Sequence, residues 1–113
     1  MSKKVIAFAV GLAFAASIHS PSFALMDEHL AAAVKHTEQA AKSGYLGDPE
    51  GVVRHSEEAL RQAKESERAS NNDHTKQGIE HLTAAIAEGQ KGNAEAGEKH
   101  ASEALTHLKA AAK

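Results

Sequence analysis

The stretch "VRHSEEAL", residues 53–60, returns 45 positions later as "EKHASEAL", residues 98–105. His, Glu, Ala and Leu occupy the same places in both copies. Ala, Leu and Glu are strong helix formers, so the stretch predicts a helix that occurs twice. Both copies carry one histidine in the same helical register.

The match extends beyond these eight residues and predicts two internal repeats, 27–68 and 72–113. At the same shift, His29 falls on His74 and His36 on His81. Gln62 falls on His107, which is one of the differences between the copies. Because only two copies occur, a closed domain is favoured over an open solenoid.

Turn residues divide each repeat into two helices. "SGYLGDPE" (43–50) and "EGQKGNAE" (88–95) carry glycines suited to helix C-caps, and Asp48-Pro49 suits an N-cap followed by Pro at the first helical position. "SNND" (70–73) offers a further N-cap. We therefore expect helices at 27–43, 49–68, 73–88 and 94–112. Short loops make sequential helices antiparallel. The predicted fold is all-α, an up-down-up-down four-helix bundle built from two tandem helical hairpins.

The apolar stripes of these helices are narrow and rich in alanine. Such stripes allow close helix approach but bury little apolar area per residue. The predicted stripes consist of Leu30, Ala33, Val34, Thr37 and Ala41; Val52, Ser56, Ala59, Leu60 and Ala63; Ile79, Leu82, Ala85 and Ile86; and Ala101, Ala104, Leu105 and Leu108.

Residues 1–24 have the pattern of a secretory signal peptide. Lys3 and Lys4 precede an apolar run over 5–18, and a small-x-small cleavage pattern ends at Ala24. The run is shorter than the roughly 20 residues that a membrane span requires. We expect cleavage after Ala24, a mature domain at 25–113 with no stable membrane anchor, and a periplasmic or secreted location.

The composition of the expected mature chain excludes several classes of site. Without Lys3 and Lys4, acidic residues outnumber basic ones, and no basic stripe suggests nucleic-acid binding. Tyr45 is then the only aromatic residue. The chain has no cysteine, so neither thiolate metal sites nor cysteine nucleophiles are available. A transition metal would have to be held by imidazole and carboxylate groups.

Histidines follow one pattern through all four predicted helices. Residues seven apart return to within about 20° of the same direction on a helix. Each histidine falls on one flank of the apolar stripe, half exposed. Histidines seven apart are about 10.5 Å apart along the axis, so sites between helices are favoured, and more than one per chain. The candidate ligands are His29, His36, His55, His74, His81, His100 and His107.

Two carboxylates share the faces of these histidines. Glu58 and Glu103 lie three residues after His55 and His100, a spacing that places both groups on one helix face. Affinities of nitrogen and oxygen sites generally follow the Irving–Williams order. This order predicts that copper(II) binds most tightly and that zinc(II) or nickel(II) binds more weakly. Protons compete with metal near the imidazole pKa of about 6.5, so binding should weaken at lower pH.

Four stretches resemble the small metal-binding protein family of bacterial periplasms. They are "VKHTEQAAKSG" (34–44), "VRHSEEAL" (53–60), "IEHLTAAIAEGQKG" (79–92) and "EKHASEALTHLKAA" (98–111). The resemblance covers essentially the whole mature chain. It implies a His-rich four-helix bundle that takes up divalent metals, copper especially, without catalysis, and it points to the same seven histidines. This chain is poorer in histidine than the family pattern, as at Gln62.

Three other functions are alternatives to metal binding. An enzyme is disfavoured, since no HExxH, ExxH, CxxCH or GxSxG motif occurs. A haem-binding bundle could use Met26 and His107, although the alanine-rich core suits haem poorly. A ligand-free helical interaction or stress protein would not respond to metal. We expect metal ions as partners, for buffering, scavenging or delivery to a metal-accepting protein, and otherwise a monomer.

Overall fold

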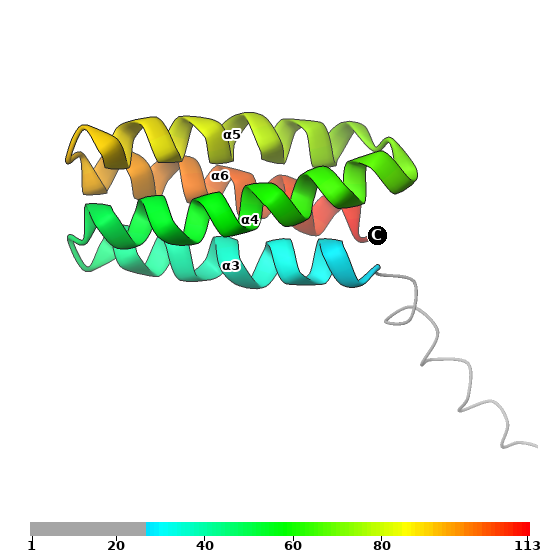
Figure 1. The fold of residues 1–113 in the computed structure, drawn as a ribbon, viewed down its shortest axis with the longest axis horizontal. Coiled ribbons are helices and arrows are strands. Elements are labelled where there is room, and N and C mark those ends of the chain that lie inside the picture. The colour runs from blue at the N-terminus through cyan, green and yellow to red at the C-terminus, as the bar shows by residue number, and fades with distance from the viewer. Residues whose placement is uncertain (1–26) are drawn as a thin grey trace, which may run out of the picture.

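The computed structural model describes residues 27–113, which fold into four helices (Figure 1). These are α3 (Glu28–Tyr45), α4 (Pro49–Ser70), α5 (Asp73–Gln90) and α6 (Ala94–Ala111). No strand occurs within this part of the chain. The predicted all-α bundle of two tandem hairpins is confirmed. The predicted signal peptide and Met26 lie outside the described residues. Of the helices in 27–113, none is both long and apolar enough to cross a membrane.

The helices pack in a square, with each one beside two neighbours. α3 packs against α4 and α6, and α5 packs against the same two helices. α4 and α6 make few contacts, because they lie across the diagonal. The outer junction of α3 with α4 and that of α5 with α6 are therefore on opposite sides of the bundle.

The helix starts follow the capping chemistry expected from the sequence. Asp48 precedes Pro49, and its side chain accepts a hydrogen bond from the backbone N–H of Gly51 at 2.9 Å. Asn72 likewise accepts from the backbone N–H of His74 at 2.8 Å. Each bond satisfies a donor that a helix start otherwise leaves free. The caps predicted at Asp48 and within 70–73 are confirmed.

The first and third helices continue two residues beyond their predicted ends. Gly44 and Gly89 were expected to terminate them, but both remain helical and are buried. A Cβ atom on Gly44 would lie only 2.8 Å from the Cα of Glu98 in α6. The turns instead use Gly47 and Gly92, whose φ angles of 77° and 84° favour glycine. Close packing, rather than termination, explains the earlier glycine of each pair.

The core consists mostly of small side chains on the inner face of each helix. Thr37 is fully buried, and its hydroxyl donates to the carbonyl of Ala33 at 2.7 Å. The predicted stripes were partly wrong, because six of their members are only half-buried: Val34, Ala41, Leu60, Ile79, Ile86 and Leu105. The buried apolar residues are Leu30, Ala33, Ala40, Val52, Ala59, Ala63, Leu82, Ala85, Ala101, Ala104 and Leu108.

Two glycines make room for the larger core residues. A Cβ atom on Gly97 would lie 2.9 Å from Cγ1 of Val52, and one on Gly78 would lie 2.7 Å from Cδ2 of Leu108. Both distances are shorter than van der Waals contact. Val52 and Leu108 thus occupy volume that a side chain at the glycine would otherwise take. Large and small residues interdigitate, as close-packed interiors require.

Candidate metal centre

Four histidines and one glutamate line the outer junction of α5 and α6, which we call the α5/α6 seam. They are His74 and His81 on α5 and His100, Glu103 and His107 on α6. The ring centroids of His74 and His107 are 6.0 Å apart, those of His107 and His81 are 5.5 Å apart, and those of His81 and His100 are 5.6 Å apart. Because the helices are antiparallel, the imidazoles alternate between them in one row.

Three side chains of this seam bring their ligand atoms together. Nδ1 of His81 lies 3.4 Å from Nδ1 of His100 and 3.4 Å from Oε1 of Glu103, and the third distance, from His100 Nδ1 to Glu103 Oε1, is 3.6 Å. Ligand atoms at about 2.1 Å from a tetrahedral ion are about 3.4 Å apart. The triangle therefore has the dimensions of one face of a tetrahedral site.

The three side chains are partly exposed to solvent and partly buried. The side chains of His81 and His100 are 29% and 33% exposed, and that of Glu103 is 53% exposed. Neutral imidazoles at such positions carry no buried charge, so holding them there involves little electrostatic penalty. An ion could enter from solvent and still leave one coordination position open.

Without metal, the Nδ1 atoms of His81 and His100 and the carboxylate of Glu103 are placed to form hydrogen bonds with one another. A neutral imidazole has one N–H donor and one acceptor nitrogen, so one of the two Nδ1 atoms can donate to the other across 3.4 Å. If an imidazole is protonated, its N–H can donate to the carboxylate of Glu103 instead. Metal binding requires both nitrogens to present lone pairs, so protons and metal compete for the same positions.

At the outer junction of α3 and α4, the α3/α4 seam, two histidines use Nδ1 for hydrogen bonds to glutamines, which leaves Nε2 of each ring with the lone pair. Nδ1 of His29 donates to Oε1 of Gln62 at 2.9 Å. Nδ1 of His36 donates in the same way to Oε1 of Gln39 at 3.2 Å. Along residues 27–113, the one group of three or more side chains with ligand atoms suitably close is His81, His100 and Glu103. The remaining candidates of the α3/α4 seam are His55 and Glu58.

Glu58 faces a cation of its own helix. Its carboxylate pairs with the guanidinium of Arg61, one turn further along α4. Both side chains are substantially exposed, so this is a solvated surface pair. The carboxylate of Glu58 therefore has a partner other than an imidazole, unlike that of Glu103.

His55 has a lowered pKa. Partial burial is the main cause, and the positive charges of Arg54 and His36 lower the pKa further, whereas Asp48 acts in the opposite direction. The influence of His36 agrees with the sequence expectation that these two helices present imidazoles to the same side. A lowered pKa keeps the ring of His55 neutral near pH 7, which is the form that binds metal.

The model of the small metal-binding protein family matches residues 2–111. The chain belongs to this family. The resemblance seen in the sequence is thereby confirmed, and metal binding is supported both by the family and by the His–Glu triangle. Among curated proteins none matches the chain. For a small metal-binding protein, the α5/α6 seam is the most complete candidate site within residues 27–113.

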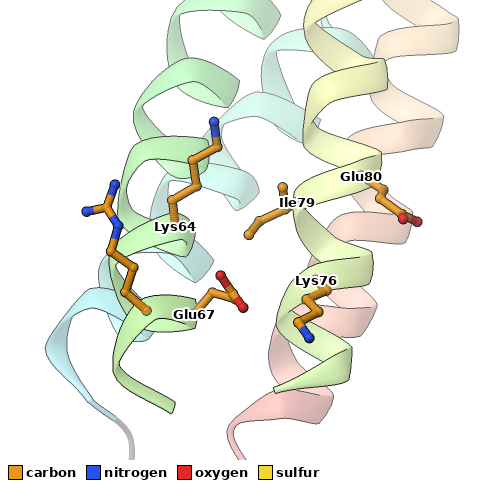
Figure 2. A pocket seen from close by; sticks show the side chains of 6 residues that line it. Lys64, Glu67, Lys76, Ile79 and Glu80 are labelled. Carbon is orange, nitrogen blue, oxygen red and sulfur yellow. The ribbon is translucent and has the colours of Figure 1, made fainter. Parts of the chain in front are cut away.

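A groove of about 490 Å³ lies elsewhere, between α4 and α5 (Figure 2). Figure 2 shows the Ile79 side chain between the two helices, with charged side chains around it. None of its lining residues is a histidine, and acidic and basic groups are mixed there, so it offers no metal site. Its lining residues are Lys64, Glu67, Arg68, Lys76, Ile79 and Glu80.

The sequence identified the residue types of the site but not their partners. It grouped Glu103 with His100 of the same helix, and the structure adds His81 from the other helix. It also missed Arg61, although Arg three residues after Glu is a common helical ion pair. The contact between His36 and Gln39 has the same i, i+3 spacing, so the sequence could have predicted it as well.

Proposed function

We propose that this protein binds divalent transition-metal ions without catalysis, and that its principal site is formed by His81, His100 and Glu103. One observation carries the proposal: all three ligand atoms lie within 4.8 Å of one another, contributed by two different helices. Family membership supports the same function.

Copper(II) is the metal that we propose binds most tightly. The triangle matches a tetrahedral face, which suits zinc(II) directly. In a square-planar copper(II) site with similar bond lengths, two of the three distances would be about 2.9 Å and the third, between trans ligands, about 4.1 Å, so the ligand atoms must shift by about half an ångström. Rotations of half-exposed side chains can supply this movement. The greater intrinsic affinity of copper(II) for nitrogen and oxygen ligands then favours it, with zinc(II) and nickel(II) binding more weakly.

The proposed role is buffering, scavenging or delivery of metal in the periplasm or outside the cell. The signal-like sequence of residues 1–24 supports that location. Half-exposed ligands and an open coordination position suit transfer, because a metal-accepting protein can add a ligand before the ion leaves. A site on the outside of a bundle has no enclosure to exclude water from a substrate, which supports a non-catalytic role.

Calorimetric titration with copper(II) at pH 7.5 tests the proposal. We expect saturable binding, and a His81→Ala/His100→Ala variant should weaken the tightest binding by ~100-fold or more, since even supporting residues of metal sites contribute 10–100-fold. His29→Ala removes a histidine that contacts Gln62 instead and should leave the tightest binding unchanged. Binding should also weaken markedly at pH 5.

Two results would contradict the proposal. Heat no larger than that of buffer controls would mean that copper(II) does not bind. Equal losses in the His81→Ala/His100→Ala and His29→Ala variants would mean that the His–Glu triangle is not the principal site.

A further inference from the structure

The two seams present the same histidine register but different neighbours. Three pairs of histidines correspond at a shift of 45 residues, His29 with His74, His36 with His81 and His55 with His100, and so do Glu58 and Glu103. The side chains around them do not correspond: positions 39, 61 and 62 hold Gln, Arg and Gln, where positions 84, 106 and 107 hold Ala, Thr and His.

We propose that Gln39, Arg61 and Gln62 act as positioning residues that make the α3/α4 seam a second, weaker metal site. The inference rests on the proposed function and deepens it by assigning unequal affinities to two sites on opposite sides of the bundle. Gln39 and Arg61 engage His36 and Glu58, whose counterparts in the α5/α6 seam face the metal position. Gln62 stands where that seam carries His107.

Arg61 has the largest consequence, because it competes for the carboxylate. Its guanidinium holds Glu58, whereas Glu103 lies 3.4 Å and 3.6 Å from the two imidazole nitrogens. The counterpart of Arg61 is Thr106, whose hydroxyl donates to a carbonyl of its own helix at 3.2 Å. Arg61 also adds a positive charge near an incoming cation. An exposed ion pair of this kind weakens competing binding by up to about fivefold.

The two glutamines act on imidazoles. Oε1 of Gln39 accepts from Nδ1 of His36, so the nitrogen that corresponds to the ligand atom of His81 carries the proton, and only Nε2 keeps a lone pair for a metal. Gln62 accepts in the same way from Nδ1 of His29 and stands where His107 extends the row of imidazoles in the other seam. An amide is a poor ligand for copper(II) compared with imidazole. The α3/α4 seam therefore has both fewer ligands and more competition.

The test transfers the residues of one seam into the other. A His81→Ala/His100→Ala background removes the proposed principal site, so copper(II) titration at pH 7.5 reports the α3/α4 seam. Adding Gln39→Ala, Arg61→Thr and Gln62→His should tighten binding by about tenfold or more, combining a freed carboxylate with an added imidazole. Arg61→Thr alone should tighten it by about two- to fivefold. Arg61→Lys, which keeps a cation beside Glu58, is the matched control and should change little.

Electron paramagnetic resonance of the copper(II) complex reports which atoms coordinate the ion. A change in protein stability alone would not alter this spectrum. The triple transfer should add a nitrogen ligand to the spectrum, whereas Arg61→Thr should exchange a water oxygen for a carboxylate without adding nitrogen. Circular dichroism confirms that each variant remains helical. In the reverse direction, Thr106→Arg in the otherwise unchanged protein should weaken the tightest site by about two- to fivefold.

The possible failures are distinguishable. If the unchanged protein binds no copper(II), the proposed function itself is wrong. If it binds copper(II) but the triple transfer neither tightens binding in the His81→Ala/His100→Ala background nor adds a nitrogen, the inference about the three positioning residues is wrong while the proposed function stands.

Discussion

In the core, the two hairpins differ because packing requires it, whereas in the seams they differ without any such requirement. Val52 and Gly97 occupy corresponding positions and face each other inside the bundle. Two valines there would collide and two glycines would leave a void. One hairpin must therefore carry a large side chain at the position where the other carries a small one. Arg61 and Thr106 face solvent on opposite sides, and neither constrains the other. Identical hairpins could not fill this core, but their seams are free to diverge in chemistry.

The largest effect should come from removing the difference in the core. Gly97→Val makes the two positions alike and should lower the free energy of unfolding by about 1–3 kcal/mol, because Val52 already fills the space. In a Val52→Ala background the penalty should largely disappear. Urea denaturation measures both. Ala87→Val, at an exposed position of α5, is the control and should lower stability only by the poorer helix propensity of valine, less than about 0.7 kcal/mol. Equal penalties in both backgrounds would mean that the two side chains do not compete for volume.

A smaller effect should distinguish Gly44 and Gly89, the buried glycines near the ends of α3 and α5. A Cβ atom on Gly44 would meet two backbone atoms of α6 at 2.8 Å, the Cα of Glu98 and the carbonyl oxygen of Ala94, and a backbone cannot rotate away. On Gly89 it would meet a side-chain methyl group of Val53 at 2.7 Å and a backbone oxygen at 2.9 Å. Gly44→Ala should therefore destabilise by about 1 kcal/mol more than Gly89→Ala, once the shared gain in helix propensity cancels. Thermal or urea unfolding of the two variants measures the difference, and equal stabilities would contradict it.

Much of this fold follows from local sequence chemistry. Asp48-Pro49 and Asn72 start helices because their side chains satisfy free backbone donors, and such caps depend only on nearby residues. The roles of Gly44 and Gly89 could not be predicted in the same way. Glycine terminates a helix or admits a neighbouring helix, and only the approach of a second helix decides which.

The candidate site was predictable to the level of the helix face and no further. Helical periodicity places His81, His100 and Glu103 on the flanks of their stripes. It does not determine which imidazoles meet across two helices, since that depends on the axial offset of α5 against α6. Nor does it determine whether a glutamate faces a histidine or an arginine, as Glu103 and Glu58 show.

The smallest expected effect concerns pH and the α3/α4 seam. The pKa of His55 is lowered in the folded state, mainly by burial. The unfolded chain therefore binds more protons than the folded one between the folded pKa and the ordinary value of about 6.5. Stability should be complete above pH 6.5 and fall as the pH drops through the folded pKa. In metal-free protein, His55→Gln should flatten this dependence in urea denaturation at a series of pH values. An unchanged slope would show that another group is responsible.

The most direct test of unequal seams follows individual histidines during a copper(II) titration. Paramagnetic copper(II) broadens the NMR signals of nearby rings, so each imidazole reports its own occupancy. At substoichiometric copper(II) and pH 7.5, the ring signals of His81 and His100 should disappear first, while those of His36 and His55 persist until more metal is added. Simultaneous broadening in both seams, or broadening of the α3/α4 seam first, would contradict the assignment of the principal site to the α5/α6 seam.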